Sequence, residues 1–320
     1  MTWSRLVRFI AEEDGKTYYG DVVESGDVGL SYSQGKRLTA RPIHLDSRDR
    51  SPLSSTFGTT PDASRPLTVR KLLAPLDPTL VTTIRGLGLQ YAPPTRDGEP
   101  AAEKAKPPPV LSLFLKPNTA IAGPGSDIVI PSSAKGEKND YEVELCVVIG
   151  DEDVPPNTDE REIMKYVAGY CVVNDVTSRG LSGKGGAGQW GMGKGYDSWC
   201  PIGPCIVHPS VLADPGSLEF STRLNDKVVQ KGNTRDLLVP VPKLLATLSK
   251  GTTLSRRSLV LTGSPVAIGR KAPGDESSES PFVKDGDVVT CWVEGIGSLI
   301  NTIREESPDQ ALTRVYKAKL

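Results

Sequence analysis

Short apolar runs bounded by glycine and proline recur along the chain and predict a β-rich fold. The 320 residues include 32 glycines and 27 prolines, and runs cut at such residues are typical of strands. Residues 3–9 and 17–23 predict a first hairpin, and "LND" at 224–226 predicts a tight turn between two later strands. Further strands are expected near residues 80–91, 127–131, 143–149, 169–175, 202–208, 218–224, 227–230, 258–262, 287–294 and 298–303.

Helical patterns are fewer than strand patterns. Asn157 is expected to cap one helix, because acidic residues, which favour a helix N-terminus, follow it at Asp159 and Glu160. The segment "LTVRKLLAPL" also has a helix-like pattern. Helices are therefore expected at residues 67–76, 158–167 and 240–249.

Two polar or proline-rich stretches interrupt these elements. Residues 24–65 predict a long irregular excursion, and "APPTRDGEPAAEKAKPPP" at 92–109 predicts a linker or mobile loop, because its prolines supply neither ladder donors nor helical turns. Many strands and few helices predict a mixed, β-rich α+β fold. A barrel or roll of mixed sheets fits this pattern better than a doubly wound sheet.

Composition and charge narrow the range of partners. With 37% hydrophobic residues, 24% charged residues and a net charge of −1, the chain resembles an ordinary soluble protein. Lys and Arg are spread along the chain, and no apolar run approaches the roughly 20 residues of a membrane span, so neither nucleic acid nor membrane is an expected partner. The N-terminus lacks a long apolar core, which predicts a cytoplasmic location. Five cysteines without a CxxC pair are expected to be reduced core thiols.

The segment "DYEVELCVVIG" at 140–150 carries two glutamates on a predicted strand. Glu142 and Glu144 are two residues apart, so they point to the same face, and like charges so close repel unless a cation lies between them. Asp175, at the end of the apolar strand "GYCVVND", is the best third ligand. Three carboxylates suit Mg²⁺, Mn²⁺ or Ca²⁺ better than zinc. The alternative is that both glutamates face solvent and that Asp175 caps a turn.

A glycine-rich segment, "GQWGMGKGYDSWCPIGP" at 188–204, carries Lys194. It begins almost like a phosphate-binding loop, but Gly195 replaces the required Ser or Thr and no helix is expected to follow. The glycines are expected to let the backbone approach a ligand, with Lys194 at the centre of the loop. The alternative is a solvated lysine.

Seven motifs in order resemble the fumarylacetoacetate hydrolase family, which includes acylpyruvate hydrolases and oxaloacetate decarboxylases or tautomerases. The resemblance covers most of residues 70–303. The motifs are "LFLKPNTAIAGPGSDIVIP", "DYEVELCVVIG", "GYCVVNDVTSR", "GKGYDSWCPIGP", "VVQKGNTRDLL", "LTGSPVAIG" and "GDVVTCWVEGIGSLIN".

The resemblance implies roles for particular residues and a mixed β-roll fold. It makes Glu142, Glu144 and Asp175 the ligands of Mg²⁺ or Mn²⁺, Lys194 the active-site lysine, and Arg179 the group that grips substrate oxygens. The expected substrate contacts are Tyr91, Arg179, Ser182, Gly263 and Ser264. A homodimer is also implied. The expected divisions are a small N-terminal domain (1–91), a proline-rich linker or lid (92–109), a catalytic domain (110–305) and a tail (306–320).

These residue types suit enolate chemistry. A divalent ion that binds both oxygens of a 1,3-dicarbonyl or 2-oxo acid lowers the energy of its enolate. Lys194 and Arg179 would stabilise negative charge that develops on oxygen. Burial beside a cation is expected to lower the pKa of Lys194, which would make it a proton carrier.

The base that activates water in family hydrolases is missing from its usual place. In "GLGLQYAPPTRDGE" Tyr91 matches the family motif, but Pro94 occupies the histidine position. Asp97, Glu99 and His44 are the candidate replacements. The other histidine, His208, is expected to be structural.

Three function classes follow from this pattern. The first is hydrolysis of a C–C bond in a 1,3-diketone or acylpyruvate. The second is enolate chemistry without hydrolytic water, such as decarboxylation, tautomerisation, isomerisation, cyclisation or dehydration, which the loss of the lid histidine favours. The third is an inactive binding protein, which the retained Glu142, Glu144, Asp175 and Lys194 disfavour.

Overall fold

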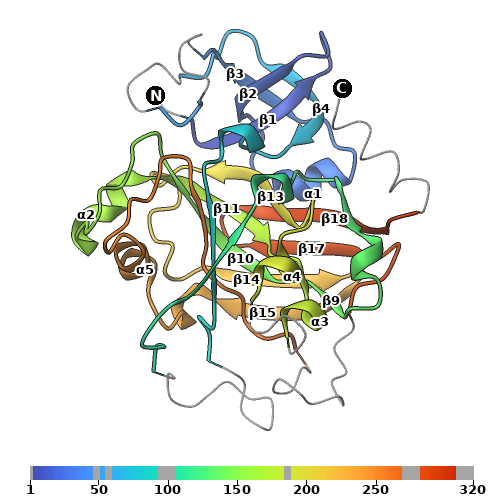
Figure 1. Ribbon diagram of the computed structural model, residues 1–320. Helices are drawn as coiled ribbons and strands as arrows, with labels where there is room; N and C mark the ends of the chain where they lie inside the picture. Colours follow the sequence, from blue (N-terminus) through green and yellow to red (C-terminus); the bar gives the residue numbers. More distant parts are fainter. Residues whose placement is uncertain are drawn as a thin grey trace.

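The first four strands form a closed ring at one end of the molecule (Figure 1). The computed structural model describes residues 3–45, 51–54, 60–92, 106–183, 189–268 and 282–307. Strand β1 pairs with both β2 and β4, and β3 pairs with the same two strands, so the four pairings close on themselves. The ring consists of β1 (Arg5–Ala11), β2 (Thr17–Val22), β3 (Thr39–Ile43) and β4 (Leu67–Leu73).

Strand β1 also pairs with β13, so the four strands of the ring and seven further strands form one large mixed sheet of eleven strands. The sheet runs from β1 through β13, β11, β10, β16 and β5 to β6 at its far edge, with β16 and β5 parallel. The short strand β7 lies parallel to β13. These strands are β5 (Ile84–Gly88), β6 (Ser112–Lys116), β7 (Ile121–Ala122), β10 (Val143–Ile149), β11 (Val167–Asn174), β13 (Cys200–Val207) and β16 (Leu259–Leu261).

A second sheet of five strands packs against the large sheet, in the order β15-β14-β17-β18-β8. Its strands are β8 (Asp127–Ile130), β14 (Glu219–Leu224), β15 (Lys227–Asn233), β17 (Val288–Val293) and β18 (Gly297–Glu305). Two short strands, β9 (Asn139–Asp140) and β12 (Thr177–Ser178), form a separate antiparallel pair.

The helices are short and lie outside the sheets, and α2 lies beside α5 at one edge of the molecule (Figure 1). The α-helices are α1 (Val28–Ser33), α2 (Glu160–Ile163), α3 (Arg179–Ser182), α4 (Gly191–Lys194) and α5 (Val241–Leu248). The 3₁₀ helices are η1 (Pro78–Leu80), η2 (Asn118–Ala120), η3 (Ser132–Ala134), η4 (Met164–Tyr166) and η6 (Thr234–Asp236). Among the described residues, no helix is long and apolar enough to cross a membrane.

Strand β10 is buried on both faces, because side chains alternate along a strand. Val143 and Leu145 face the core that the five-stranded sheet covers, whereas Cys146 and Val148 face a second core on the other side of the large sheet. Glu144 lies on the same face as Cys146. The carboxylates therefore lie at the margin of the second core.

The predicted β-rich mixed α+β fold is confirmed by this architecture, and most predicted strands are present. The predicted helix at 67–76 is wrong, because residues 67–73 form β4. The buried residues of "LTVRKLL" fit the period of a helix as well as that of a strand. Pairing with β1 and β3 decides in favour of a strand. Strand β6 was not predicted.

Two further expectations need correction. Residues 24–65 were expected to be irregular, yet they contain α1, which Asp27 caps through Leu30 N–H, and strand β3. Asn157 does not cap the next helix. Asp159 does, by accepting a hydrogen bond from Arg161 N–H, while the Asn157 side chain accepts from Gly251 N–H.

The predicted domain boundary at residue 91 stays a prediction. Strand β5 precedes it in sequence but pairs with β16 and β6, which follow it. Most of the predicted 92–109 linker and 306–320 tail lies outside the described residues.

Candidate metal centre and active site

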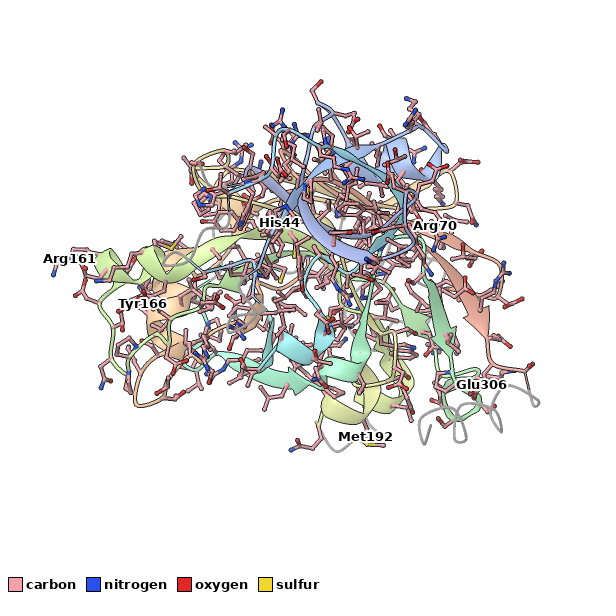
Figure 2. All side chains as sticks on the ribbon, turned by 90° about the horizontal axis from the view of Figure 1, so that it is seen from above. His44, Arg70, Arg161, Tyr166, Met192 and Glu306 are labelled. Carbon is pink, nitrogen blue, oxygen red and sulfur yellow. The ribbon has the colours of Figure 1, made fainter. Side chains whose placement is uncertain are left out.

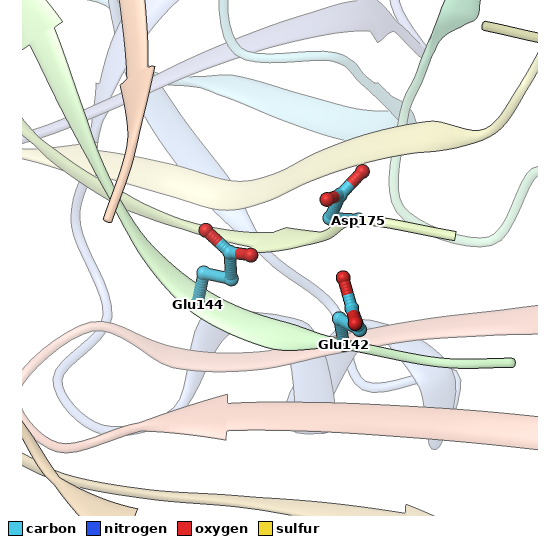
Figure 3. A group of neighbouring side chains, drawn as sticks. All are labelled: Glu142, Glu144 and Asp175. Atoms are coloured by element: carbon cyan, nitrogen blue, oxygen red, sulfur yellow. The ribbon is translucent and has the colours of Figure 1, made fainter. Parts of the chain in front are cut away.

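Three carboxylates converge at the end of two neighbouring strands (Figure 3). Glu142 directly precedes β10, Glu144 lies within it, and Asp175 directly follows β11. One oxygen from each lies within 4.8 Å of the others. The antiparallel pairing of Val143 with Asn174 and of Glu144 with Val173 brings the end of β11 beside the start of β10. The structure therefore brings the three residues together as the sequence predicted.

The Lys194 ammonium lies among these carboxylates. Its Nζ donates hydrogen bonds to Glu142 Oε2 at 2.7 Å, Asp175 Oδ2 at 2.6 Å and Thr177 Oγ1 at 2.6 Å. Nζ also lies 4.7 Å from the centre of the Phe114 ring. Helix α4 ends at Lys194, and Gly193 makes this approach possible, because a Cβ there would be 2.0 Å from Ser182 Oγ.

The pKa of Lys194 is raised in the protein alone, and the lowering expected beside a bound cation stays a prediction. Burial acts to lower the pKa, but Asp175 and Glu142 outweigh it by stabilising the ammonium. Lys194 is therefore a cationic hydrogen-bond donor in this arrangement rather than a base.

Arg179 contacts the same cluster from helix α3. Its guanidinium donates to Asp140 Oδ2 at 2.7 Å and to Glu142 Oε1 at 2.5 Å. Burial alone would raise the pKa of Glu142, but Arg179 and Lys194 hold it well below its usual range. Glu142 is thus an ionised carboxylate that is clamped between two cations.

Glu144 differs from Glu142 because no cation contacts it directly among the described residues. Its Oε2 accepts a hydrogen bond from Gly263 N–H at 2.6 Å. Burial raises its pKa well above the usual value, and the nearby Asp175 and Glu142 raise it further. Glu144 is therefore the carboxylate whose ionisation most requires an added positive charge.

Lys116 is a member of the cluster that was not predicted from the sequence. It is the last residue of β6, its side chain is fully buried, and its Nζ donates to Asp175 Oδ1 at 2.5 Å and to Trp199 O at 2.7 Å. The signal was present in "LFLK", where Lys116 lies two residues after Phe114 and so shares its buried face. A lysine on a buried strand face requires a charged partner.

The turn after β16 holds two predicted substrate contacts. Gly263 has φ +93, and Ser264 Oγ accepts a hydrogen bond from Gln230 Nε2 at 3.0 Å. Gln230 Oε1 also accepts a hydrogen bond, at 3.2 Å, from the N–H of Val143, the residue between the two glutamates. This buried glutamine, which was also not predicted from the sequence, links the Ser264 turn to the strand of the carboxylates.

Two other predicted substrate contacts border the cluster. Tyr91 is half-buried and packs edge-on against Phe220, and burial together with the charges of Glu144 and Asp236 raises its pKa. Ser182 ends α3 beside Gly193, and its buried hydroxyl has no hydrogen-bond partner among the described residues. The substrate contacts expected of both residues stay predictions.

The candidate bases are not in the described cluster. His44 follows β3 on the N-terminal ring, its side chain is 74% exposed, and its Nε2 lies 3.5 Å from Asp62 Oδ2. Figure 2 separates His44 clearly from Met192, which lies in the same helix as Lys194. Asp97 and Glu99 lie outside the described residues.

The residues present fit a divalent metal ion. All three candidate ligands supply oxygen, which Mg²⁺, Mn²⁺ and Ca²⁺ prefer. Burial first, and then the charges of Asp175 and Glu142, raise the pKa of Glu144, and a cation beside it would favour its ionised form. Glu142, Glu144 and Asp175 are therefore the side chains that would hold the ion.

Comparison with known families identifies the class of protein. Residues 83–304 match the model of the fumarylacetoacetate (FAA) hydrolase C-terminal family. The chain therefore belongs to the fumarylacetoacetate hydrolase family, and it is an enzyme of that family.

Relatives within the family catalyse different reactions. The chain is 34% identical over 316 residues to a caffeoylpyruvate hydrolase of Neonothopanus nambi, which covers 95% of this chain and 94% of the relative. It is also 34% identical to the mitochondrial oxaloacetate tautomerase Fahd2a of Rattus norvegicus, over 68% of this chain and 64% of the relative.

Solved structures of the family share the fold. A fumarylacetoacetate hydrolase from Exiguobacterium antarcticum superposes with a TM-score of 0.74 at 27% identity, over 95% of this chain and 100% of the other. A 2-hydroxyhepta-2,4-diene-1,7-dioate isomerase from Mycobacterium marinum gives a TM-score of 0.72 at 27% identity, over 95% and 99%.

Proposed function

We propose that this enzyme hydrolyses a C–C bond in an acylpyruvate, a 1,3-dicarbonyl that ends in a 2-oxo acid, with Mg²⁺ as cofactor. The observation that carries the proposal is the convergence of Glu142, Glu144 and Asp175 around the Lys194 ammonium. A divalent ion at these carboxylates would supply Lewis-acid stabilisation of the substrate's enolate.

The extent of the relatives supports hydrolysis over the other reactions. The caffeoylpyruvate hydrolase aligns over nearly the whole of both chains. The oxaloacetate tautomerase aligns over about two thirds of each chain. An identity of 34% does not indicate that this enzyme also acts on a caffeoyl group. The proposal therefore extends only to acylpyruvates as a class.

The chain's own cations and donors perform the remaining work. Lys194 stays protonated and supplies positive charge beside the carboxylates, where negative charge develops on the substrate's oxygens. The Arg179 side chain is 38% exposed, and its guanidinium is the type of group that binds a substrate carboxylate. Ser264 presents a hydroxyl that Gln230 holds in place.

A second candidate is tautomerisation of a 2-oxo acid such as oxaloacetate. Pro94 at the position of the family's lid histidine favours it, because enolisation needs no attacking water. The same carboxylates, lysine and arginine would serve both reactions.

Product analysis with Mg²⁺ tests the proposal. Acetylpyruvate should yield acetate and pyruvate, and the activity should require Mg²⁺ and be lost in Asp175→Asn. Interconversion of the enol and keto forms of oxaloacetate without any cleavage of acetylpyruvate or benzoylpyruvate would instead support tautomerisation.

A further inference from the structure

Trp190 lies one helical turn before Lys194 and on the same side of the helix. Trp190 is the N-cap of α4 and has helical backbone angles, and Lys194 is the last residue of that helix. Residues four apart on a helix are neighbours on one face. Both side chains also contact Phe114. The Trp190 ring packs edge-on with its centre 5.7 Å from the centre of the Phe114 ring, and Lys194 Nζ lies 4.7 Å from that same centre.

The strands beneath these side chains lead outward from the carboxylate cluster. Lys116 and Phe114 of β6 are two residues apart, so they share one face, and Lys116 Nζ donates to Asp175 Oδ1 at 2.5 Å from it. On the neighbouring strand β5, Gly88 lies further along the same face, away from Lys116. A Cβ on Gly88 would be 2.3 Å from the Trp190 ring. Lys116, Phe114 and Trp190 therefore follow one another on one face, with Lys116 nearest the cluster.

Polarity changes along this row from charged to apolar. Lys116 and Phe114 are buried, whereas Trp190 is partly exposed, so part of its apolar surface is not covered by the fold. A large aromatic side chain in this position offers contact area to a ligand at a low cost in conformational entropy. An acylpyruvate has the same order of polarity, because its carboxylate and oxo groups lie at one end and its acyl substituent at the other.

We propose that Trp190 is a specificity-determining residue that packs against the acyl substituent of the substrate, and that the enzyme prefers an aromatic acylpyruvate to acetylpyruvate. This inference rests on the hydrolysis proposed above. The polar end of the substrate would lie at the carboxylates and Lys194, which leaves the substituent to extend along the row toward Trp190. An aromatic ring there buries apolar area and packs on the indole, whereas the methyl group of acetylpyruvate offers much less area.

Trp190→Leu tests this role, because leucine keeps an apolar side chain but removes the aromatic surface. The kcat/KM values for benzoylpyruvate and acetylpyruvate are measured with Mg²⁺, and wild type should have the higher value for benzoylpyruvate. In Trp190→Leu the value for benzoylpyruvate should fall about 10-fold, mainly through KM, as expected for lost apolar contact in a pocket. The value for acetylpyruvate should stay within about threefold of wild type.

A second variant and a matched control separate specificity from folding. Gly88→Ala keeps the indole but displaces it, because the added Cβ would overlap its ring, and it should lower the preference for benzoylpyruvate even where Trp190→Leu does not fold. Trp292→Leu changes another partly exposed tryptophan, on β17 of the five-stranded sheet, and should leave both kcat/KM values unchanged.

The outcomes distinguish this inference from the proposed function. A wild-type enzyme without a preference for benzoylpyruvate, or an unchanged preference in Trp190→Leu and Gly88→Ala, would overturn the specificity role while the proposed hydrolysis stands. An equal fall for both substrates would do the same, because it would mean that Trp190 only holds Phe114 beside Lys194. A wild-type enzyme that cleaves neither acetylpyruvate nor benzoylpyruvate would overturn the hydrolysis, and this inference with it.

Discussion

At the scale of single residues, the charge balance around Asp175 determines how the cluster holds together. Asp175 lies between two buried ammonium groups, with Lys116 on Oδ1 and Lys194 on Oδ2. Each cation stabilises the fold through a buried hydrogen bond to Asp175. Removing one partner of such a contact is strongly destabilising, because it leaves an uncompensated buried charge.

Lys116→Met should therefore destabilise the protein by about 3 kcal/mol in the absence of a divalent ion. Mg²⁺ should raise the melting temperature of this variant more than that of wild type, because the ion replaces part of the missing charge. Lys135→Met, which removes an exposed pair with Glu305, should change stability by less than about 0.5 kcal/mol. Equal losses in the two variants, measured by thermal unfolding, would contradict the account.

The sequence predicted the carboxylates but not all of their partners. Glu142 and Glu144 are recognisable because they lie two residues apart where β10 begins, so their common face follows from local geometry alone. Lys116 and Gln230 come from strands that no short-range pattern connects with β10. Their positions depend on tertiary pairing.

At the scale of elements, strands β5 and β6 show how glycine makes room for the aromatic side of the site. Gly86 pairs directly with Phe114, and a Cβ on Gly86 would lie 2.0 Å from the Phe114 ring. The next outward glycine, Gly88, leaves the corresponding space for Trp190, which packs edge-on against Phe114. The Phe114 ring can therefore lie beside Lys194 because Gly86, its partner on the neighbouring strand, has no side chain.

Gly86→Ala should destabilise the protein by about 1–3 kcal/mol, as overpacking usually does, and lower kcat by moving Phe114 against Lys194. Gly191→Ala is the matched control for stability, because nothing lies within 4 Å of the added Cβ. Chemical denaturation measures both variants. An unchanged unfolding free energy in Gly86→Ala would refute the packing argument.

Element type was predictable where periodicity was clear and failed where it was not. Strands such as β10 and β11 are continuous apolar runs, and the structure has them close to the expected bounds. In β4, Arg70 and Lys71 are both exposed, which breaks the strict alternation that marks a strand. Its two neighbours in the ring, not its own pattern, determine its conformation.

At the scale of the whole molecule, the N-terminal ring and the large sheet are tied together beyond β1. Asp77, which caps η1 before β5, accepts hydrogen bonds from Thr79 N–H at 3.0 Å and from Arg8 of β1 at 2.5 Å. Burial would raise the pKa of Asp77, but the Thr79 donors and Arg8 lower it overall. The ionised carboxylate is thus the form that the fold favours.

The stability that Asp77 contributes should depend on pH. Because its pKa in the fold is below the ordinary value of 3.8, the contribution is complete above that pH and is lost as the pH falls through the lower, folded value. Asp77→Asn keeps a capping oxygen but loses the charge that pairs with Arg8, so it should cost up to about 1 kcal/mol at pH 7, and the difference should shrink in acid. Urea unfolding at pH 7 and near pH 3 measures it, and a pH-independent difference would argue against the assignment.

The central claim is that Glu142, Glu144 and Asp175 together hold a divalent cation that the reaction requires. Calorimetric titration of Mg²⁺ into wild type and Glu144→Gln, paired with acetylpyruvate turnover, tests it most directly. Wild type should bind one ion, and the variant should lose both ion binding and turnover while it keeps the wild-type fold. Undiminished Mg²⁺ binding and turnover in Glu144→Gln would contradict the account.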